Sequence, residues 1–227
     1  AGPLPQTLKK LRIILVPGFA YDVIPNYMET NLKRLRALGL DAVMVDTDPL
    51  GSTKDNAPRI AATIEQAKQE KKRVAIIGHS NGANQSLGTL RLFPKLQSNV
   101  SCLITIQTPY GGTALADWFF SPPWIYTTVM AYSRLLNPAR LLHTNPFFRD
   151  ETIRELLQDN RSLRNLSSSP LPKRIKILSV ASRVKENTSS HFLLRLLAGA
   201  VKAVGGRDSD GLVVPEILRV PWLGAVS

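Results

Sequence analysis

The sequence has 227 residues, 44% of them hydrophobic and 20% charged, and this balance excludes an intrinsically disordered chain. Its apolar runs are far shorter than the roughly 20 residues that span a bilayer. The single cysteine, Cys102, excludes an intrachain disulfide and a cysteine-based metal cluster. The net charge of +12 favours anionic partners, although the basic residues are spread over many segments, as on ordinary solvated faces. Without a basic stripe that carries interleaved aromatic residues, nucleic acid is not an expected partner.

Strand and helix patterns alternate along the chain. Apolar runs predict five strands, at 11–16, 41–45, 73–77, 101–106 and 175–181. Helical periodicity predicts helices over 24–38 and 58–70, and a third helix that begins just after Ser80. This order indicates right-handed βαβ units. We therefore expect one α/β domain over residues 1–227, with a mostly parallel central sheet and helices on both faces.

A long segment without a strand pattern separates the fourth and fifth predicted strands. A compact sheet does not need such a connection, so residues 114–169 are predicted to form a helical cap or lid over the active edge of the sheet. The segment 118–126 alone contains five aromatic residues and two prolines. These apolar side chains either line a groove for acyl chains or serve ordinary cap packing.

The motif Gly78-His79-Ser80-Asn81-Gly82 lies directly after the third predicted strand and directly before a helical pattern. This context is what a nucleophile elbow requires, because the sharp turn exposes a serine hydroxyl and leaves room only for glycine two residues away on each side. The turn also places the hydroxyl at a helix N-terminus, whose free amides favour negative charge. The pattern predicts Ser80 as a catalytic nucleophile.

The order and separation of four segments resemble the bacterial lipase and esterase branch of the α/β-hydrolase family. The resemblance extends over nearly the whole chain and implies the α/β-hydrolase fold. One departure is Pro17, where many family members carry histidine before the glycine. The four segments are Val16-Pro17-Gly18-Phe19, the Ser80 motif, Thr108-Pro109-Tyr110-Gly111-Gly112-Thr113 and Asp210-Gly211-Leu212-Val213.

Acyl transfer builds an oxyanion that needs two backbone amides placed in advance. One expected donor is the N–H of Asn81, the residue after the nucleophile. The resemblance implies the N–H of Phe19 as the second, whereas a simple strand-ending turn is the alternative interpretation of that segment. Asp210 lies in a polar turn after the fifth strand, and the resemblance implies that it is the triad acid. Its neighbour Asp208 has the alternative interpretation of a turn-capping side chain.

The catalytic base is harder to assign, because each of the three histidines is poorly placed for it. His79 adjoins the serine at a strand end, so its side chain is expected to point away and pack beneath the elbow. His143 lies within the insert, and His191 precedes Asp210, which would invert the family's order. The resemblance implies a histidine beyond Ser227, after a C-terminal strand and before a closing helix. His191 is the fallback base.

The sequence therefore predicts a serine hydrolase that cleaves carboxylic esters of lipid-like substrates, with transient contact to an anionic membrane or lipid surface. A thioesterase or acyltransferase with the same triad is one alternative, and a non-catalytic hydrolase-like binding or scaffold protein is another. The resemblance implies no metal and no organic cofactor. Some related lipases carry a structural calcium, for which the sequence indicates no ligands. The resemblance favours a secreted or periplasmic location, and the oligomeric state is not predicted.

Overall fold

A five-stranded parallel sheet forms the centre of the computed structural model, which describes residues 5–19, 21–23, 26–110, 112, 155 and 171–180. The strand order is β2-β1-β3-β4-β5, and every neighbouring pair is parallel. A parallel sheet places the carboxyl ends of all its strands at one edge, where ligands bind in open α/β folds. The strands are β1 Leu11–Val16, β2 Asp41–Met44, β3 Arg73–His79, β4 Val100–Ile106 and β5 Lys176–Val180.

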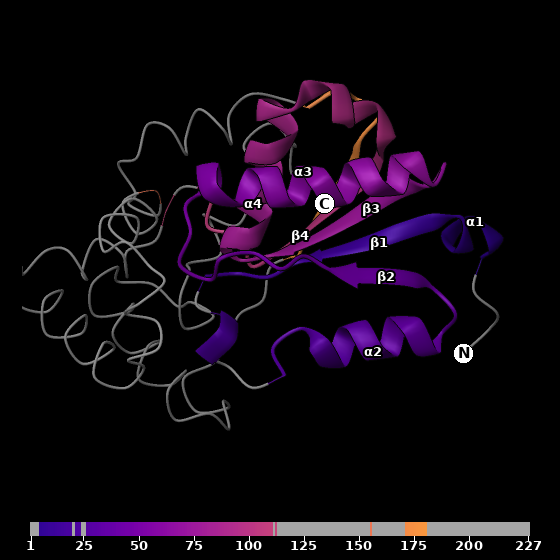
Figure 1. Cartoon of the computed structure of the whole chain (residues 1–227), viewed down its shortest axis with the longest axis horizontal. Coiled ribbons are helices and arrows are strands. Elements are labelled where there is room, and N and C mark those ends of the chain that lie inside the picture. Colours follow the sequence, from indigo (N-terminus) through magenta and orange to yellow (C-terminus); the bar gives the residue numbers. More distant parts are fainter. Residues whose placement is uncertain are drawn as a thin grey trace, which may run out of the picture.

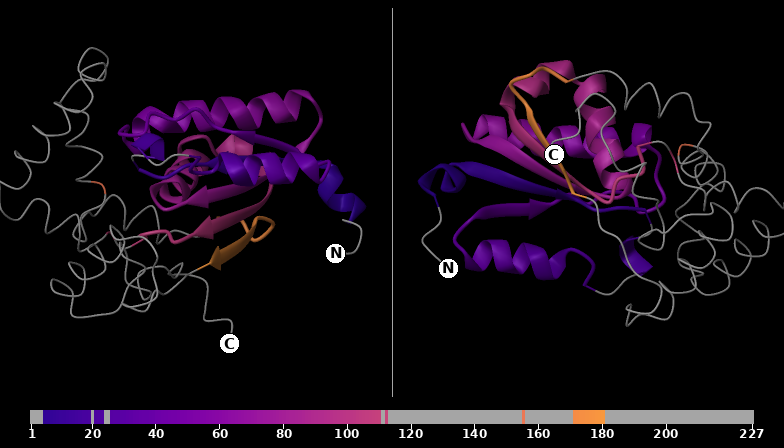
Figure 2. Two further views of the ribbon diagram at one scale, coloured as in Figure 1. Left: turned by 90° about the horizontal axis from the view of Figure 1, so that it is seen from below. Right: turned by 180° about the vertical axis from the view of Figure 1, so that it is seen from behind.

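Helices cover both faces of this sheet. Helix α2 lies on one face beside β2, and helices α3 and α4 lie together on the other face (Figures 1 and 2). This arrangement confirms the predicted mostly parallel sheet between two helical layers. Within the described residues, no helix combines the length and the apolar character needed to cross a membrane. The helical elements are α1 Gln6–Lys9, η1 Tyr21–Val23, α2 Glu29–Ala37, α3 Thr53–Gln69, α4 Asn81–Leu92 and η2 Pro94–Asn99.

All five predicted strands are confirmed, with ends that shift by at most two residues. Two predicted helix starts are wrong. Helix α2 begins at Glu29 and not at residue 24, because residues 26–28 form a turn in which Asn26 adopts a φ of 55°. Helix α3 begins at Thr53, five residues before the predicted start at Pro58. Proline favours the first turn of a helix, but here it lies inside one.

The early start of α3 has a clear cause in its capping box. The Ser52 hydroxyl accepts a hydrogen bond from the Asp55 N–H at 3.3 Å, and the Asp55 carboxylate accepts one from the Ser52 N–H at 2.9 Å. Two amide groups that the helix itself cannot satisfy are thereby paired. This local signal in the sequence marks the true N-terminus of α3.

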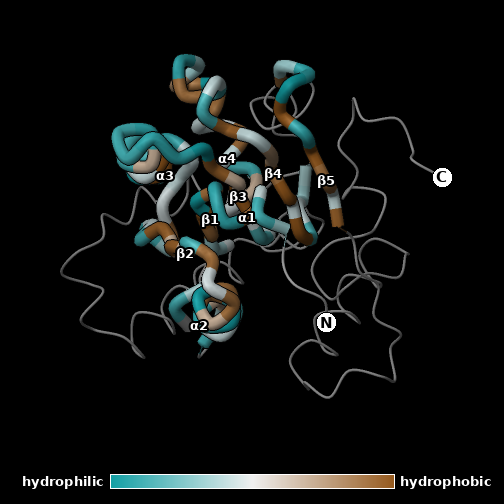
Figure 3. The backbone as a smooth tube through the Cα atoms, turned by 90° about the vertical axis from the view of Figure 1, so that its right-hand side faces the viewer, coloured by the Kyte–Doolittle hydropathy of each residue, from teal (hydrophilic) through white to brown (hydrophobic). Residues whose placement is uncertain are grey.

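Strand β1 contributes to two separate hydrophobic cores. Ile14 and Val16 face α3 and α4, whereas Ile13 and Leu15 face α2, as the alternation of side chains along a strand requires. The tube view shows the apolar segments of the strands stacked between the two helical layers (Figure 3). Ile60 and Ile64 on α3 are fully buried and belong to the larger of these two cores.

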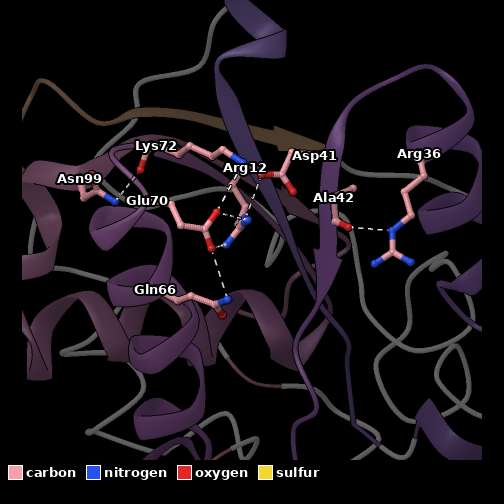
Figure 4. Close-up of polar contacts among 8 residues, drawn as sticks. All are labelled: Arg12, Arg36, Asp41, Ala42, Gln66, Glu70, Lys72 and Asn99. Atoms are coloured by element: carbon pink, nitrogen blue, oxygen red, sulfur yellow. Dashed lines mark hydrogen bonds and ion pairs between the residues drawn. The ribbon is translucent and has the colours of Figure 1, made fainter.

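The amino edge of the sheet is held by a cluster of charges (Figure 4). Arg12, only 7% exposed, donates to Asp41 at 3.0 Å and to both carboxylate oxygens of Glu70 at 3.0 and 2.7 Å. Lys72 donates to the same Asp41 oxygen at 2.7 Å. These residues come from the starts of β1 and β2, the end of α3 and the approach to β3. The cluster therefore joins three neighbouring strands and a helix at the edge opposite the strands' carboxyl ends.

Candidate active site

Ser80 lies at the carboxyl edge of the sheet, in the one-residue turn between β3 and α4. Its backbone has φ 52° and ψ −127°, a conformation that residues with a side chain rarely adopt. The Ser80 N–H donates to the Ile106 carbonyl at 2.8 Å, which ties the turn to the end of β4. The serine residue is half-buried at this edge of the sheet.

Glycines on both sides of Ser80 permit close backbone packing. A Cβ atom on Gly82 would lie 2.3 Å from the Pro17 carbonyl oxygen and 2.4 Å from that of Val16. A Cβ on Gly78 would lie 2.5 Å from the Cα of Ala83. Real Cβ atoms do not approach other atoms so closely, so both positions require glycine. The predicted steric reason for the spacing of these two glycines is therefore confirmed.

The loop after β1 packs directly on the turn. A Cβ on Gly18 would lie 3.0 Å from the Ser80 Cβ, so this backbone reaches the nucleophile candidate. Phe19 follows and is half-buried, and its N–H makes no hydrogen bond within the described residues. Asn81 is the first residue of α4, where backbone N–H groups have no partner inside the helix. The two amides expected to bind an oxyanion thus lie on the two segments that meet at Ser80.

The His79 ring is hydrogen-bonded to two residues other than Ser80. Its Nδ1 atom is hydrogen-bonded to the Tyr27 hydroxyl, and its Nε2 atom lies 2.8 Å from Gln107 Oε1. The Tyr27 and His79 rings also meet edge to face, with centroids 5.3 Å apart. Both ring nitrogens therefore have partners other than the serine hydroxyl, in agreement with the expectation that the His79 side chain points away from it.

Tyr27 and Gln107 are site residues that the sequence analysis missed. Gln107 directly follows β4 and has a φ of 50°, so a second strained residue lies beside Ser80 at the same edge. Its N–H donates to the Val180 carbonyl at 2.9 Å. Tyr27 lies in the turn before α2. Neither residue belongs to a motif. The predicted strand end before Gln107 is the one signal that could have indicated that residue, and no sequence signal indicated Tyr27.

Buried polar side chains on α4 hold the surrounding loops. Asn84 donates to the Pro109 carbonyl at 3.2 Å, and Gln85 donates to the Gly51 carbonyl at 3.1 Å. The loops after β2 and β4 are thereby fixed to the helix that follows Ser80. The carboxamide of Asn81 is also buried, but it has no hydrogen-bond partner within the described part of the chain.

One residue of the predicted insert is described, and it contacts the body of the domain. Glu155 accepts hydrogen bonds from the Thr53 N–H at 2.9 Å and from the Thr53 hydroxyl at 2.9 Å. Thr53 is the first residue of α3, so a carboxylate from the insert lies at a helix N-terminus, where negative charge is favoured. This contact attaches part of the insert at the carboxyl edge of the sheet, beside the loop after β2.

Several predicted residues fall outside the described parts of the chain. They are Asp208 and Asp210, His143 and His191, and the insert 114–169 apart from Glu155. The structure therefore brings together Ser80, Phe19 and Asn81, and the triad acid and base stay predictions.

Comparison with known proteins places this geometry in a structural context. No protein-family model matches the chain, and no curated protein sequence matches it. Among solved structures, a carboxyl esterase of metagenomic origin shares 22% identity and a TM-score of 0.69, with 96% of this chain and 63% of that chain covered. This chain thus spans less than two thirds of the length of that esterase.

Two further solved structures are similar over most of this chain. The mature form of a lipase from Bacillus licheniformis shares 20% identity and a TM-score of 0.62, with 100% of this chain and 84% of that chain covered. The phospholipase PlaB from Legionella pneumophila shares 17% identity and a TM-score of 0.59, with 92% and 46% covered. Together with the strand order and the turn at Ser80, these similarities show that the chain has the α/β-hydrolase fold.

Proposed function

We propose that the protein is a serine hydrolase that cleaves carboxylic esters, with Ser80 as its nucleophile. The observation that carries the proposal is the strained turn between β3 and α4, where Ser80 has a φ of 52° and the Gly18 backbone packs against its Cβ. A strained serine between a strand and a helix is costly, by about 1–3 kcal/mol, and persists at active sites where the strain serves the chemistry. The solved esterase, lipase and phospholipase structures of the same fold support this reaction class.

In the proposed mechanism, Ser80 Oγ attacks the ester carbonyl and a histidine takes the hydroxyl proton. The backbone N–H groups of Phe19 and Asn81 donate to the oxyanion of the tetrahedral intermediate. The histidine then donates its proton to the leaving alcohol, and water repeats the sequence to release the acid. Asp210 orients this histidine and stabilises its charged form. The identity of this histidine is not assigned by the described residues, and His191 is the fallback.

The proposed substrates are lipid-like esters. The aromatic residues concentrated at 118–126 and the net charge of +12 both suit a protein that works at an anionic lipid surface. Binding to anionic vesicles is expected to exceed binding to zwitterionic vesicles and to weaken with salt. Equal binding to both vesicle types at low salt would assign the charge to solubility alone.

The direct test is covalent labelling with a fluorophosphonate probe, which reacts with activated serines. The native protein is expected to be labelled at Ser80, as located by peptide mass mapping, and Ser80→Ala is expected to lose the label while remaining folded. A panel of p-nitrophenyl esters and matched thioesters then separates an esterase from a thioesterase. His191→Ala distinguishes the fallback base from a histidine further along the chain. An unlabelled native protein would favour the non-catalytic scaffold.

A further inference from the structure

Three hydrogen-bonded side chains connect the loop after β1, the Ser80 turn and the end of β4. They are Tyr27, His79 and Gln107. We propose that Tyr27 is a positioning residue for the oxyanion hole, because its hydroxyl packs against the Gly18 backbone and is hydrogen-bonded to the His79 ring, and so fixes the loop that carries the Phe19 amide. The inference rests on the proposed function.

The hydrogen bonds in this chain have one consistent direction. The Tyr27 hydroxyl oxygen lies against the Gly18 backbone, 2.9 Å from the position that a Cβ atom on Gly18 would take. The carboxamide oxygen of Gln107 faces His79 Nε2 at 2.8 Å, so that nitrogen carries the ring proton and Nδ1 is an acceptor. Tyr27 therefore donates its hydroxyl proton to Nδ1. The hydroxyl thus packs against the loop and donates to the elbow, a role that neither phenylalanine nor another apolar side chain can fill.

The Gly18 backbone is buried between the Tyr27 hydroxyl and the Ser80 Cβ, and one amide of the same loop is left to a substrate. The next amide, that of Phe19, makes no hydrogen bond within the described residues. The three side chains thus hold Gly18 against Ser80 and leave the Phe19 N–H available to the oxyanion.

Burial keeps Tyr27 in the protonated form that this role requires. Loss of water contact raises the pKa of Tyr27 to about 12, even though the nearby Gly18 N–H acts in the opposite direction. The hydroxyl therefore remains a donor to His79 throughout the neutral and mildly alkaline range. The series of hydrogen-bonded side chains ends at Gln107. The backbone N–H of this residue donates to the Val180 carbonyl at 2.9 Å, which fixes its position.

Tyr27→Phe tests the inference, because it removes only the hydroxyl and keeps the ring against His79. The matched control is Tyr21→Phe. The ring centroids of Tyr21 and Tyr27 lie 6.3 Å apart, but the Tyr21 hydroxyl donates to the Thr47 carbonyl. With a p-nitrophenyl ester, Tyr27→Phe is expected to lower kcat by roughly 10- to 100-fold and to leave KM within about twofold, because the loop contacts the oxyanion and not the ground-state ester. Tyr21→Phe is expected to keep the native kcat.

A second measurement is independent of activity. Exchange of the Gly18 amide hydrogen with deuterium is expected to become about tenfold faster or more in Tyr27→Phe and to remain unchanged in Tyr21→Phe. His79→Asn and His79→Gln extend the test, because the first keeps an acceptor near the Nδ1 position and the second keeps a polar group near Nε2. If Tyr27 is the link that fixes the loop, His79→Asn retains more of the native kcat than His79→Gln.

Different outcomes overturn different statements. A Tyr27→Phe protein with native kcat, or with native exchange at Gly18, would refute the positioning role even though the native enzyme hydrolyses esters. An equal loss of kcat in the two tyrosine variants would refute it too, because packing would then explain the effect. A native protein that neither hydrolyses esters nor reacts with fluorophosphonate at Ser80 would refute the proposed function, and the positioning role with it.

Discussion

The two edges of the parallel sheet are built in opposite ways. At the amino edge, Arg12, Asp41, Glu70 and Lys72 form ion pairs near the starts of strands (Figure 4), whereas Ser80 follows the carboxyl end of β3. At the carboxyl edge, the backbone of Ser80 is strained and Gly82 packs against carbonyl oxygens at distances that only glycine permits. The sheet therefore has stabilising charges at one edge and strained backbone geometry at the other.

The sharpest way to test this contrast is to relieve the strain at Ser80. Ser80→Ala and Ser80→Gly are both expected to lower ester hydrolysis by at least about 1,000-fold, since both remove the nucleophile. Ser80→Gly is also expected to be about 1 kcal/mol more stable than Ser80→Ala, because glycine adopts a φ of 52° without the cost that alanine has there. Urea unfolding of both variants measures the difference, and equal stabilities would show that the turn stores no strain.

Gly82→Ala should damage both activity and stability. The new methyl group would lie 2.3 Å from the Pro17 carbonyl oxygen, so the loop after β1 must move away from Ser80. We expect a loss of about 2–3 kcal/mol in the free energy of unfolding and at least a tenfold loss of kcat. The control is Gly39→Ala, which has no atom within 4 Å of the added Cβ and a φ of +74°. It should cost about 1 kcal/mol and leave kcat unchanged.

At the amino edge the expected pattern is the reverse. Arg12→Leu leaves the partly buried Asp41 without its guanidinium partner, so the free energy of unfolding should fall by about 3 kcal/mol. The catalytic constants at 25 °C should stay within about twofold of the native values, because no residue of this cluster reaches the Ser80 turn. A large fall in kcat for a variant that is still folded would show that the two edges are coupled.

The same cluster predicts how stability responds to acid. Burial disfavours the charged form of Asp41, but hydrogen bonds from Lys72 and Arg12 outweigh it and lower the pKa of this carboxyl. A lowered pKa in the folded state gives stability that is present above the ordinary pKa and is lost as pH falls through the folded value. Unfolding midpoints should therefore decline below about pH 4. The decline should be shallower in Asp41→Asn than in the native protein, and an identical slope would exclude this origin.

The smallest effect is expected at Asn81. Its role in the proposed oxyanion hole belongs to the backbone N–H, and its buried carboxamide has no hydrogen-bond partner within the described residues. Asn81→Ala keeps that N–H, so kcat should stay within about threefold of the native value. Stability should not fall, because an unpaired buried amide costs about 1–3 kcal/mol. A loss of kcat comparable with that of Gly82→Ala would assign the side chain a part in the chemistry.

The sequence by itself determined the strands, the parallel α/β plan and the glycines around Ser80. These features depend on periodicity and on short-range sterics, which a local pattern carries. The sequence also contained the Ser52 and Asp55 capping box, although Pro58 was mistaken for the start of α3. That error arose because a proline inside a helix costs one hydrogen bond, which the buried face of α3 can outweigh.

Only the tertiary structure decided how His79 is held and which loop amide is free. Tyr27 and His79 are 52 residues apart, and His79 and Gln107 are 28 apart, so no local pattern could join them. The positive φ of Gln107 likewise follows from where β4 ends beside β5, and its own residue type does not favour it. The contacts that arrange the loop around Ser80 depend on strands brought together by the sheet, which is why they become visible only in the folded chain.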